Sequence, residues 1–339
     1  MFDTLGSTHR RHHRADHRTT SGAEPDGSGY RREAETKRGF LAPHFKRSES
    51  IAHGVQRLLK SELDSALALL STSDQSLDYR VHEARKCLKR LRALFALVED
   101  KLDEELVASE RACIRVAAHS LADLRSAAAL KETFDALIDR YPGTLPSVIV
   151  DGVQSVLTRP PESSDAAAAL NAAIDALGSA RDGVRKLDLA GHGWAVIDRG
   201  FRRTYARARR YLRRARDSRN VDELHDFRTQ QKRHYYQLEL LIKVWPKLVR
   251  VECRELDRLG ERLGEHHDLS LLLPELERRG LNPAEAVDLP LLVERRRKDL
   301  EEGILFRGAR LFAEAPRARA RRYAGYYGAF RSRTKTKSI

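Results

Sequence analysis

The chain has 339 residues, 41% of them hydrophobic, and a formal net charge of +14 at pH 7. This length and apolar content allow one large domain or two small ones with a proper core. No stretch offers the roughly 18 consecutive apolar residues of a membrane span, and the segment "MFDTLGSTHRRHHRADHR" has no apolar centre like that of a secretory signal. The charge predicts attraction to polyanions, namely nucleic acid, an anionic membrane surface or an inorganic phosphate polymer.

The chain begins and ends with segments that are expected to be tails. Residues 1–46 are rich in Arg, His, Ser, Thr and Gly and lack apolar periodicity, which predicts a disordered basic tail. Residues 313–339 are also basic and are expected to be a loose C-terminal tail. Between the tails the apolar spacing is helical almost throughout. It predicts helices over 48–72, 77–100, 103–126, 128–140, 145–157, 164–188, 194–217, 221–244, 247–265, 268–279 and 288–312.

Three cysteines lie inside these helical patterns: Cys87, Cys113 and Cys253. Their number is odd and no two form a CxxC pair, so neither a disulfide framework nor a zinc site is indicated. A reducing, cytoplasmic setting is therefore expected.

A motif occurs twice in the chain, as "VHEARKCLKRLR" at 81–92 and "LHDFRTQQKRHY" at 224–235. The matching residues are separated by 143 positions, and they are His82 with His225, Arg85 with Arg228, Lys89 with Lys232 and Arg90 with Arg233. A second pair of similar segments, 121–130 and 263–272, predicts a related turn in each half. The expected fold is all-α, with duplicated helical bundles over about 47–190 and 191–312 that are related by a pseudo-twofold axis, with a cleft or channel between them.

The motif spacing places its cations on one helix face. At about 100° per residue, one face of the first motif helix carries its cations and the opposite face is apolar. The members of the cationic face are His82, Arg85, Lys86, Lys89 and Arg92, with Arg90 at its margin. In the second copy His225, Arg228 and Lys232 share the polar face. Like charges one turn apart repel, so we expect two equivalent cationic faces that turn toward a shared passage and a bound phosphate chain.

The densest basic stretch is "RGFRRTYARARRYLRRAR" at 199–216, with nine arginines and no acidic residue. One side of this helix is expected to carry Arg202, Arg209, Arg213 and Arg216. Another side carries Arg203, Arg207, Arg210 and Arg214. This helix predicts that one wall of the channel is more positive than the other.

These residues resemble the CHAD family, through the paired H-x-x-R-x-x-x-K-R signature and the L-G-x-x-[RH]-D-like turns at 121–126 and 263–268. The resemblance covers about residues 47–312. It implies two helical bundles about a basic central channel that binds inorganic polyphosphate, and, for some members, association with polyphosphate granules. The chain departs from the family pattern at Ser126, at His267 and at His234-Tyr235.

The resemblance and the helix faces together give the predicted polyphosphate-binding residues. From the first motif they are His82, Arg85, Lys86, Lys89, Arg90 and Arg92, and from the second His225, Arg228, Lys232 and Arg233. Position and charge add Arg202, Arg203, Arg209 and Arg210. No catalytic residue, metal ligand or cofactor is expected, and the oligomeric state is left open.

Two alternatives to a non-catalytic polyphosphate-binding protein remain. The first is nonspecific nucleic-acid binding through the arginine helix and the tails, with Tyr205 and Tyr211 as residues that could stack on bases. The second is an enzyme, because "EAETK" at 33–37 fits the E-x-E-x-K pattern of the CYTH triphosphate-tunnel enzymes. Only about ten residues separate this segment from the first helix, which is too few for a β-barrel, so we interpret it as a chance match.

Overall fold

The computed structural model describes residues 43–158, 166–218, 220–281 and 288–332, and every regular element in these ranges is helical. The all-α prediction is therefore confirmed. The helices are α2 (Ile51–Ser71), α3 (Leu77–Val98), α4 (Glu104–Ser120), α5 (Asp123–Arg140), α6 (Ser147–Thr158), α7 (Ala166–Arg185), α8 (Asp198–Ser218), α9 (Val221–Leu240), α10 (Pro246–Arg278), α11 (Asp288–Leu311) and α12 (Pro316–Ser332), with short 3-10 helices η2 (Glu99–Lys101) and η3 (Gly193–Val196). The predicted tail over 1–42 and the "EAETK" segment lie outside the described residues.

Several helices begin at residues that can cap them. Ser50 and Ser76 each accept a hydrogen bond from a backbone N–H in the first turn of α2 and α3. Asp103 and Asn220 do the same for α4 and α9. A side-chain oxygen at this position satisfies a backbone donor that the helix itself leaves unpaired. Local sequence thus fixes where both motif helices, α3 and α9, start.

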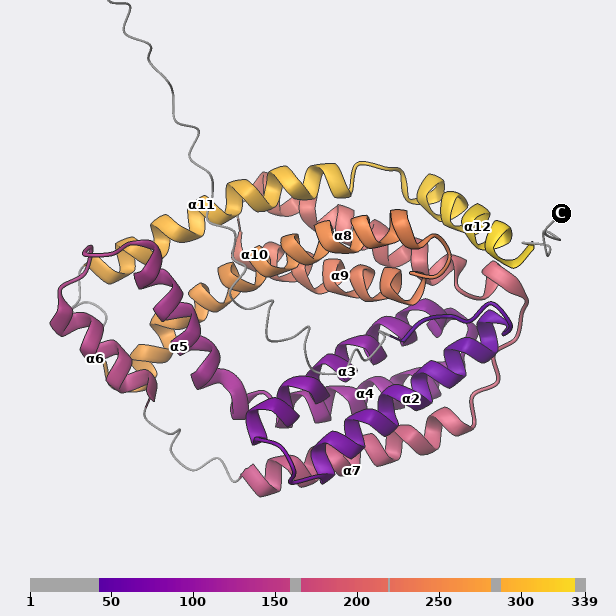
Figure 1. The fold of residues 1–339 in the computed structure, drawn as a ribbon, viewed down its shortest axis with the longest axis horizontal. Helices are drawn as coiled ribbons and strands as arrows, with labels where there is room; N and C mark the ends of the chain where they lie inside the picture. The colour runs from indigo at the N-terminus through magenta and orange to yellow at the C-terminus, as the bar shows by residue number, and fades with distance from the viewer. Residues whose placement is uncertain (1–42, 159–165, 219, 282–287, 333–339) are drawn as a thin grey trace, which may run out of the picture. The chain divides into compact units, whose positions relative to one another are not determined.

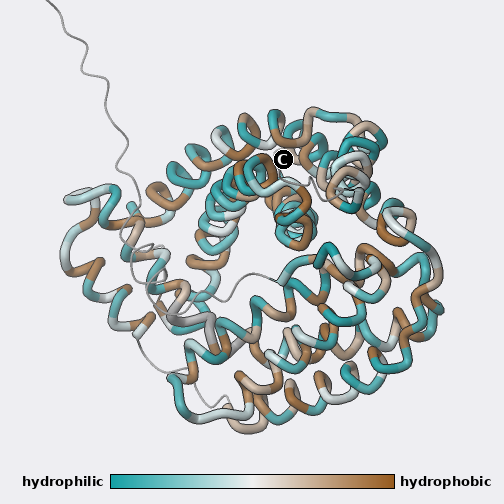
Figure 2. Tube along the Cα trace, turned by 45° about the vertical axis from the view of Figure 1, so that its right-hand side comes forward, coloured by the Kyte–Doolittle hydropathy of each residue, from teal (hydrophilic) through white to brown (hydrophobic). Residues whose placement is uncertain are grey.

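The helices between Ile51 and Leu311 pack in two main groups. Helices α2, α3, α4 and α7 pack on one another, and α8, α9, α10 and α11 form the second group (Figure 1). Hydrophobic and hydrophilic positions alternate along each helix (Figure 2), as expected for helices that bury one face. The motif helices α3 and α9 belong to different groups and contact each other directly. The pseudo-twofold axis and the channel remain predictions.

Helix α8 approaches α3 very closely where the two groups meet. A Cβ atom on Gly200 would lie 2.1 Å from the carbonyl oxygen of Leu97, so only glycine allows this contact. Nearby, the buried amide of Gln237 on α9 donates to the Ala93 carbonyl oxygen at 3.2 Å and to Thr204 Oγ1 at 3.1 Å. These contacts join α3, α8 and α9 at one place, and they satisfy polar groups that would be costly to bury alone.

Two predicted helix boundaries are wrong. Helix α10 runs unbroken through 263–268, where a turn was expected, because Leu263, Leu269 and Leu272 continue one buried apolar stripe across that segment. In the first half the chain does break between α4 and α5, at residues 121–122, which lie inside the predicted turn at 121–126 but before the predicted helix boundary at 127. The two segments that looked alike in sequence therefore fold differently.

The prediction of a loose C-terminal tail is also wrong for residues 316–332. They form α12, which packs on α8 and buries Ala320 and Tyr323. Arg319 is only 5% exposed, and its Nε donates to Nε2 of the buried His234 at 3.1 Å. The basic composition of this segment predicts a tail, but the segment also carries an apolar stripe that packs on the protein core.

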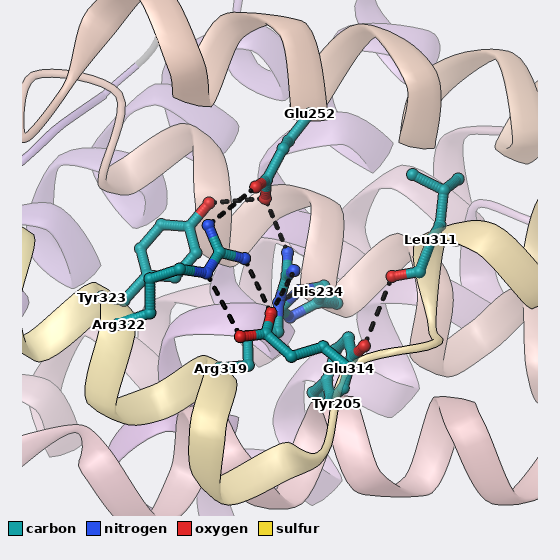
Figure 3. Close-up of polar contacts among 8 residues, drawn as sticks. All are labelled: Tyr205, His234, Glu252, Leu311, Glu314, Arg319, Arg322 and Tyr323. Carbon is teal, nitrogen blue, oxygen red and sulfur yellow. Dashed lines mark hydrogen bonds and ion pairs between the residues drawn. The ribbon is translucent and has the colours of Figure 1, made fainter.

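A carboxylate completes the polar network beneath α12. Glu252 on α10 accepts hydrogen bonds from Arg319 at 2.8 Å, from Arg322 at 3.1 Å and from the Tyr323 hydroxyl at 2.6 Å (Figure 3). Glu314 pairs with Arg322 at 2.8 Å. Because Glu252 is shared by several donors, it compensates the charge that α12 brings into the core.

The start of the described chain is packed as well. Phe45 is 2% exposed, and its N–H donates to the Leu240 carbonyl oxygen at 3.0 Å. The predicted tail boundary at residue 46 is therefore a few residues too late, because Phe45 fills part of the core.

Two general properties of the described helices bear on function. None of them combines the length and apolar content that crossing a bilayer requires. All three cysteines are free thiols, and burial raises the pKa of Cys87 to about 12.

Glu110 on α4 is buried without a charged partner among the described residues. It is 2% exposed, its Oε2 accepts no hydrogen bond from the described residues, and its side chain fills the space beside Gly183 on α7. Burial raises the pKa of this carboxyl to about 7.

We expect Arg319→Leu to lower the free energy of unfolding by about 3–5 kcal/mol, because it removes one partner from a buried charge network. Urea denaturation followed by circular dichroism measures this loss. Arg317→Leu, at an exposed position of the same helix, should change stability by less than about 0.5 kcal/mol. If both substitutions lowered the free energy of unfolding equally, the buried charge network would not be a source of stability.

We expect the contribution of Glu110 to the free energy of unfolding to fall by roughly 3 kcal/mol as the pH rises from about 4.5 to about 7. The folded-state pKa of Glu110 lies above its unfolded value. As the pH rises, the unfolded chain therefore loses this proton before the folded protein does. The stabilisation by the protonated Glu110 carboxyl is complete only below the pKa of the unfolded state. When the free energy of unfolding is measured across this pH range, the difference between Glu110→Gln and the wild type should change by this amount, because the variant lacks the Glu110 contribution. The exposed Glu302→Gln on α11 should retain the wild-type slope.

Candidate anion-binding site

The first motif helix presents its cations in very different surroundings. Arg90 is paired with the buried carboxylate of Glu62 on α2, with Nε 2.8 Å from Oε2. Burial acts to lower the pKa of the Arg90 guanidinium, but the charge and hydrogen bond of Glu62, together with Cys87 and Tyr236, raise it overall. Arg85 donates to the Leu121 carbonyl oxygen at 3.1 Å. Lys86 pairs with Glu83 one turn away at 2.7 Å.

The remaining predicted residues of this helix are His82, Lys89 and Arg92. His82 and Lys89 are half-buried, and His82 Nε2 lies 3.9 Å from Glu83. Arg92 is exposed. The first copy of the motif therefore combines one neutralised arginine, Arg90, with cations that a ligand could reach.

In the second copy the histidine lies beside a second histidine. His225 Nδ1 is 3.3 Å from Nδ1 of His267 on α10. Burial, and then the charges of Arg228 and His225, lower the pKa of His267 to about 4. Burial also lowers the pKa of Arg228, although Asp268 opposes this shift. At neutral pH, therefore, His267 is uncharged and the neighbouring Arg228 is positively charged.

The positive charge of Lys232 is balanced by a carboxylate, whereas that of Arg233 is not. Lys232 Nζ lies 3.3 Å from Asp257 on α10 and 5.2 Å from the centre of the Tyr235 ring. Arg233 has no ion-pair partner within the described ranges. Burial, together with the positive charges of Arg92, Arg111 and Arg207, lowers its pKa to about 10.

Four helices thus bring guanidinium groups together in what we call the arginine cluster. It consists of Arg92 on α3, Arg111 on α4, Arg203 and Arg207 on α8, and Arg233 on α9. Two carboxylates reach it, both at the C-terminal end of α3. Glu99 contacts Arg111 and lies 2.7 Å from Arg203, and Asp100 lies 3.7 Å from Arg203.

Positive charge dominates the cluster in spite of these acids. Burial, then Arg203 and Arg207, lower the pKa of Arg111. Burial also lowers the pKa of Arg203, and the charge of Asp100 does not reverse the shift. A group whose pKa is lowered in this way is less stable when charged in the folded protein than in water. The cluster therefore favours an anion that can approach several guanidinium groups at once.

The expected equivalence of the two cationic faces does not hold. Arg90 and Arg233 occupy the same motif position, yet Arg90 is paired with Glu62 and Arg233 is surrounded by arginines.

Of the four predicted arginines of α8, only Arg203 belongs to the cluster. Arg202 lies 3.9 Å from Asp198, Arg209 is half-buried, and Arg210 is exposed beside the Tyr211 ring. Tyr205 is fully buried and donates to the Leu311 carbonyl oxygen at 3.3 Å. Tyr205 therefore packs in the core and offers no surface to a nucleic-acid base.

Sequence reasoning missed Arg111 and Arg207 as members of the site. The signal for Arg207 was present, since it shares a helix face with Arg203. Arg111 had no such signal, because α4 carries no repeated cationic motif and its neighbours include several acids. Only the packing of α4 near α8 and α9 reveals its role.

Within the described parts of the chain, no three His, Cys, Asp or Glu side chains are grouped so that they could hold a metal ion.

The comparisons with known proteins give one family. The family model described as CHAD domain matches residues 63–277. The matched region contains both motif copies and all five arginines of the cluster, and it ends before α11. No curated protein matches the chain.

We expect Arg233→Gln and Arg90→Gln to change stability in opposite directions in the absence of ligand. Arg233→Gln relieves uncompensated charge and should raise the free energy of unfolding by roughly 1–3 kcal/mol at low ionic strength. Arg90→Gln leaves Glu62 buried without its partner and should lower it by about 3 kcal/mol. Urea denaturation at low and high salt measures both effects, and added salt should reduce the gain for Arg233→Gln. If both variants were destabilised by a similar amount, the charge of Arg233 would have to be balanced by an acidic partner, contrary to this expectation.

Proposed function

The chain belongs to the CHAD domain family, and from that premise we propose that it binds inorganic polyphosphate through the arginine cluster without catalysing a reaction. The family is associated in general with polyphosphate. In this proposal the cluster forms the positive wall of the basic channel that the family resemblance implies. The protein acts in the cytoplasm and can associate with polyphosphate granules.

The observation that carries the proposal is the excess of guanidinium groups around Arg233, whose pKa falls to about 10. Five arginines from four helices meet only two carboxylates among the described residues. Such an arrangement costs folding free energy until an anion occupies it. Polyphosphate carries a negative charge on every repeating unit, and each phosphate can accept paired hydrogen bonds from a guanidinium fork.

The exposed face of α8 extends the positive surface beyond the cluster. Arg210, Arg213 and Arg214 are exposed there, and Arg210 and Arg214 lie over the Tyr211 ring. A long polyanion could continue along this face after leaving the cluster. The same face is the feature that favours the alternative, nonspecific binding of nucleic acid.

The cluster can be tested with the double variant Arg207→Gln/Arg233→Gln. We expect its affinity for fluorescently labelled long-chain polyphosphate to fall at least about tenfold, because it loses two charge-assisted contacts. Fluorescence anisotropy over a series of salt concentrations measures the affinity, which should fall steeply with ionic strength in the wild-type protein.

Arg317→Gln/Arg321→Gln is the matched control, because it removes the same charge from exposed positions of α12. This control should bind nearly as well as the wild type. Equal losses in the two double variants, or an affinity that ignores salt, would contradict the proposal. In competition at equal phosphate concentration, polyphosphate should displace RNA, and the reverse result would favour the nucleic-acid alternative.

A further inference from the structure

The carboxylate of Glu99 occupies part of the arginine cluster. Glu99 is the first residue of η2, directly after α3, and its side chain is only 12% exposed. Its Oε1 lies 2.7 Å from Arg203 Nη2, and its Oε2 contacts Arg111 Nη2. The carboxylate therefore bridges two helices, α4 and α8, through one guanidinium group on each.

This is the position that a phosphate oxygen of a ligand would seek. A carboxylate and a phosphate both accept paired hydrogen bonds from guanidinium groups, so they compete for the same donors. Within the described residues Arg92, Arg207 and Arg233 have no ion-pair partner, whereas Arg111 and Arg203 are engaged by Glu99. An arriving anion thus meets three available guanidinium groups and one repelling carboxylate.

We propose that Glu99 is a specificity-determining residue, whose carboxylate competes with ligand phosphate for Arg111 and Arg203 and so excludes anions of low total charge. This inference rests on the proposed polyphosphate function. A single phosphate or a short chain carries few negative charges, so its attraction to the three available arginines offsets less of the repulsion from Glu99. A long chain gains further contacts at little added entropic cost, because its units are already linked.

Asp100 supports Glu99 from the adjacent position. Its side chain is 8% exposed and lies 3.7 Å from Arg203 Nη1. It touches only one of the five arginines, and the contact is longer than that of Glu99. Its effect on an incoming anion should have the same sign and be smaller.

The alternative role for Glu99 is to hold Arg111 and Arg203 in place for the ligand. The two roles predict opposite results for Glu99→Gln. The amide keeps an oxygen that can accept a hydrogen bond, so the packing of η2 is retained while the negative charge is lost. A competitor that loses its charge makes binding tighter, whereas a positioning residue that loses its charge makes binding weaker.

The test compares affinities for tripolyphosphate and for long-chain polyphosphate by isothermal titration calorimetry. We expect Glu99→Gln to raise the affinity for tripolyphosphate about tenfold, which corresponds to about 1.4 kcal/mol. The gain for the long chain should be smaller, because the long chain also binds arginines outside the cluster. Asp100→Asn should give a smaller gain of the same sign, and it keeps the inference testable if Glu99→Gln does not fold.

Glu302→Gln is the matched control. Glu302 is an exposed residue of α11, outside the cluster, and its substitution changes the net charge by the same amount. A comparable gain in affinity for Glu302→Gln would show that the effect comes from net charge alone, and it would overturn the inference. Unchanged or weaker tripolyphosphate binding by Glu99→Gln, while the wild-type protein binds long-chain polyphosphate, overturns the inference alone. Absence of polyphosphate binding by every protein in the series overturns the proposed function and the inference with it.

Discussion

The close packing of α8 against α3 is the constraint on which the site depends. Gly200 lets the two helices approach until a Cβ atom would meet the backbone of Leu97, and Gln237 ties α9 into the same junction. Once these three helices are fixed, arginines that are distant in sequence must lie near one another. Arg92, Arg207 and Arg233 then share a region in which the described acids are too few to balance them.

Repetition in sequence does not produce equivalence in space. Arg90 and Arg233 occupy the same place in the two motif copies, but α2 supplies Glu62 to the first, whereas the second faces guanidinium groups from α3, α4 and α8. Arg90 is thus held in an ion pair, whereas Arg233 is repelled by the neighbouring guanidinium groups. In the proposed function a bound anion relieves this repulsion, so the free energy that the repulsion costs the fold is recovered as ligand affinity.

Helix α12 shows the limit of composition as a guide. The segment is strongly basic, and its arginines favoured a tail in solution. In the fold, Glu252 accepts hydrogen bonds from Arg319, Arg322 and Tyr323, and His234 accepts one from Arg319. Charge on a residue therefore does not exclude burial when a carboxylate from another helix lies opposite. The unbroken α10 has a related explanation, because its apolar stripe continues where local similarity to 121–126 indicated a turn.

The sequence by itself determined the helical class, the starts of the motif helices at Ser76 and Asn220, the face that carries the cations, and the family. These properties follow from periodicity and capping, which act between residues a few positions apart. Only the tertiary structure decided which cations are neutralised and that Arg111 and Glu99 belong to the site. Charge compensation depends on distances between helices that local sequence does not encode, and it falls steeply as those distances grow.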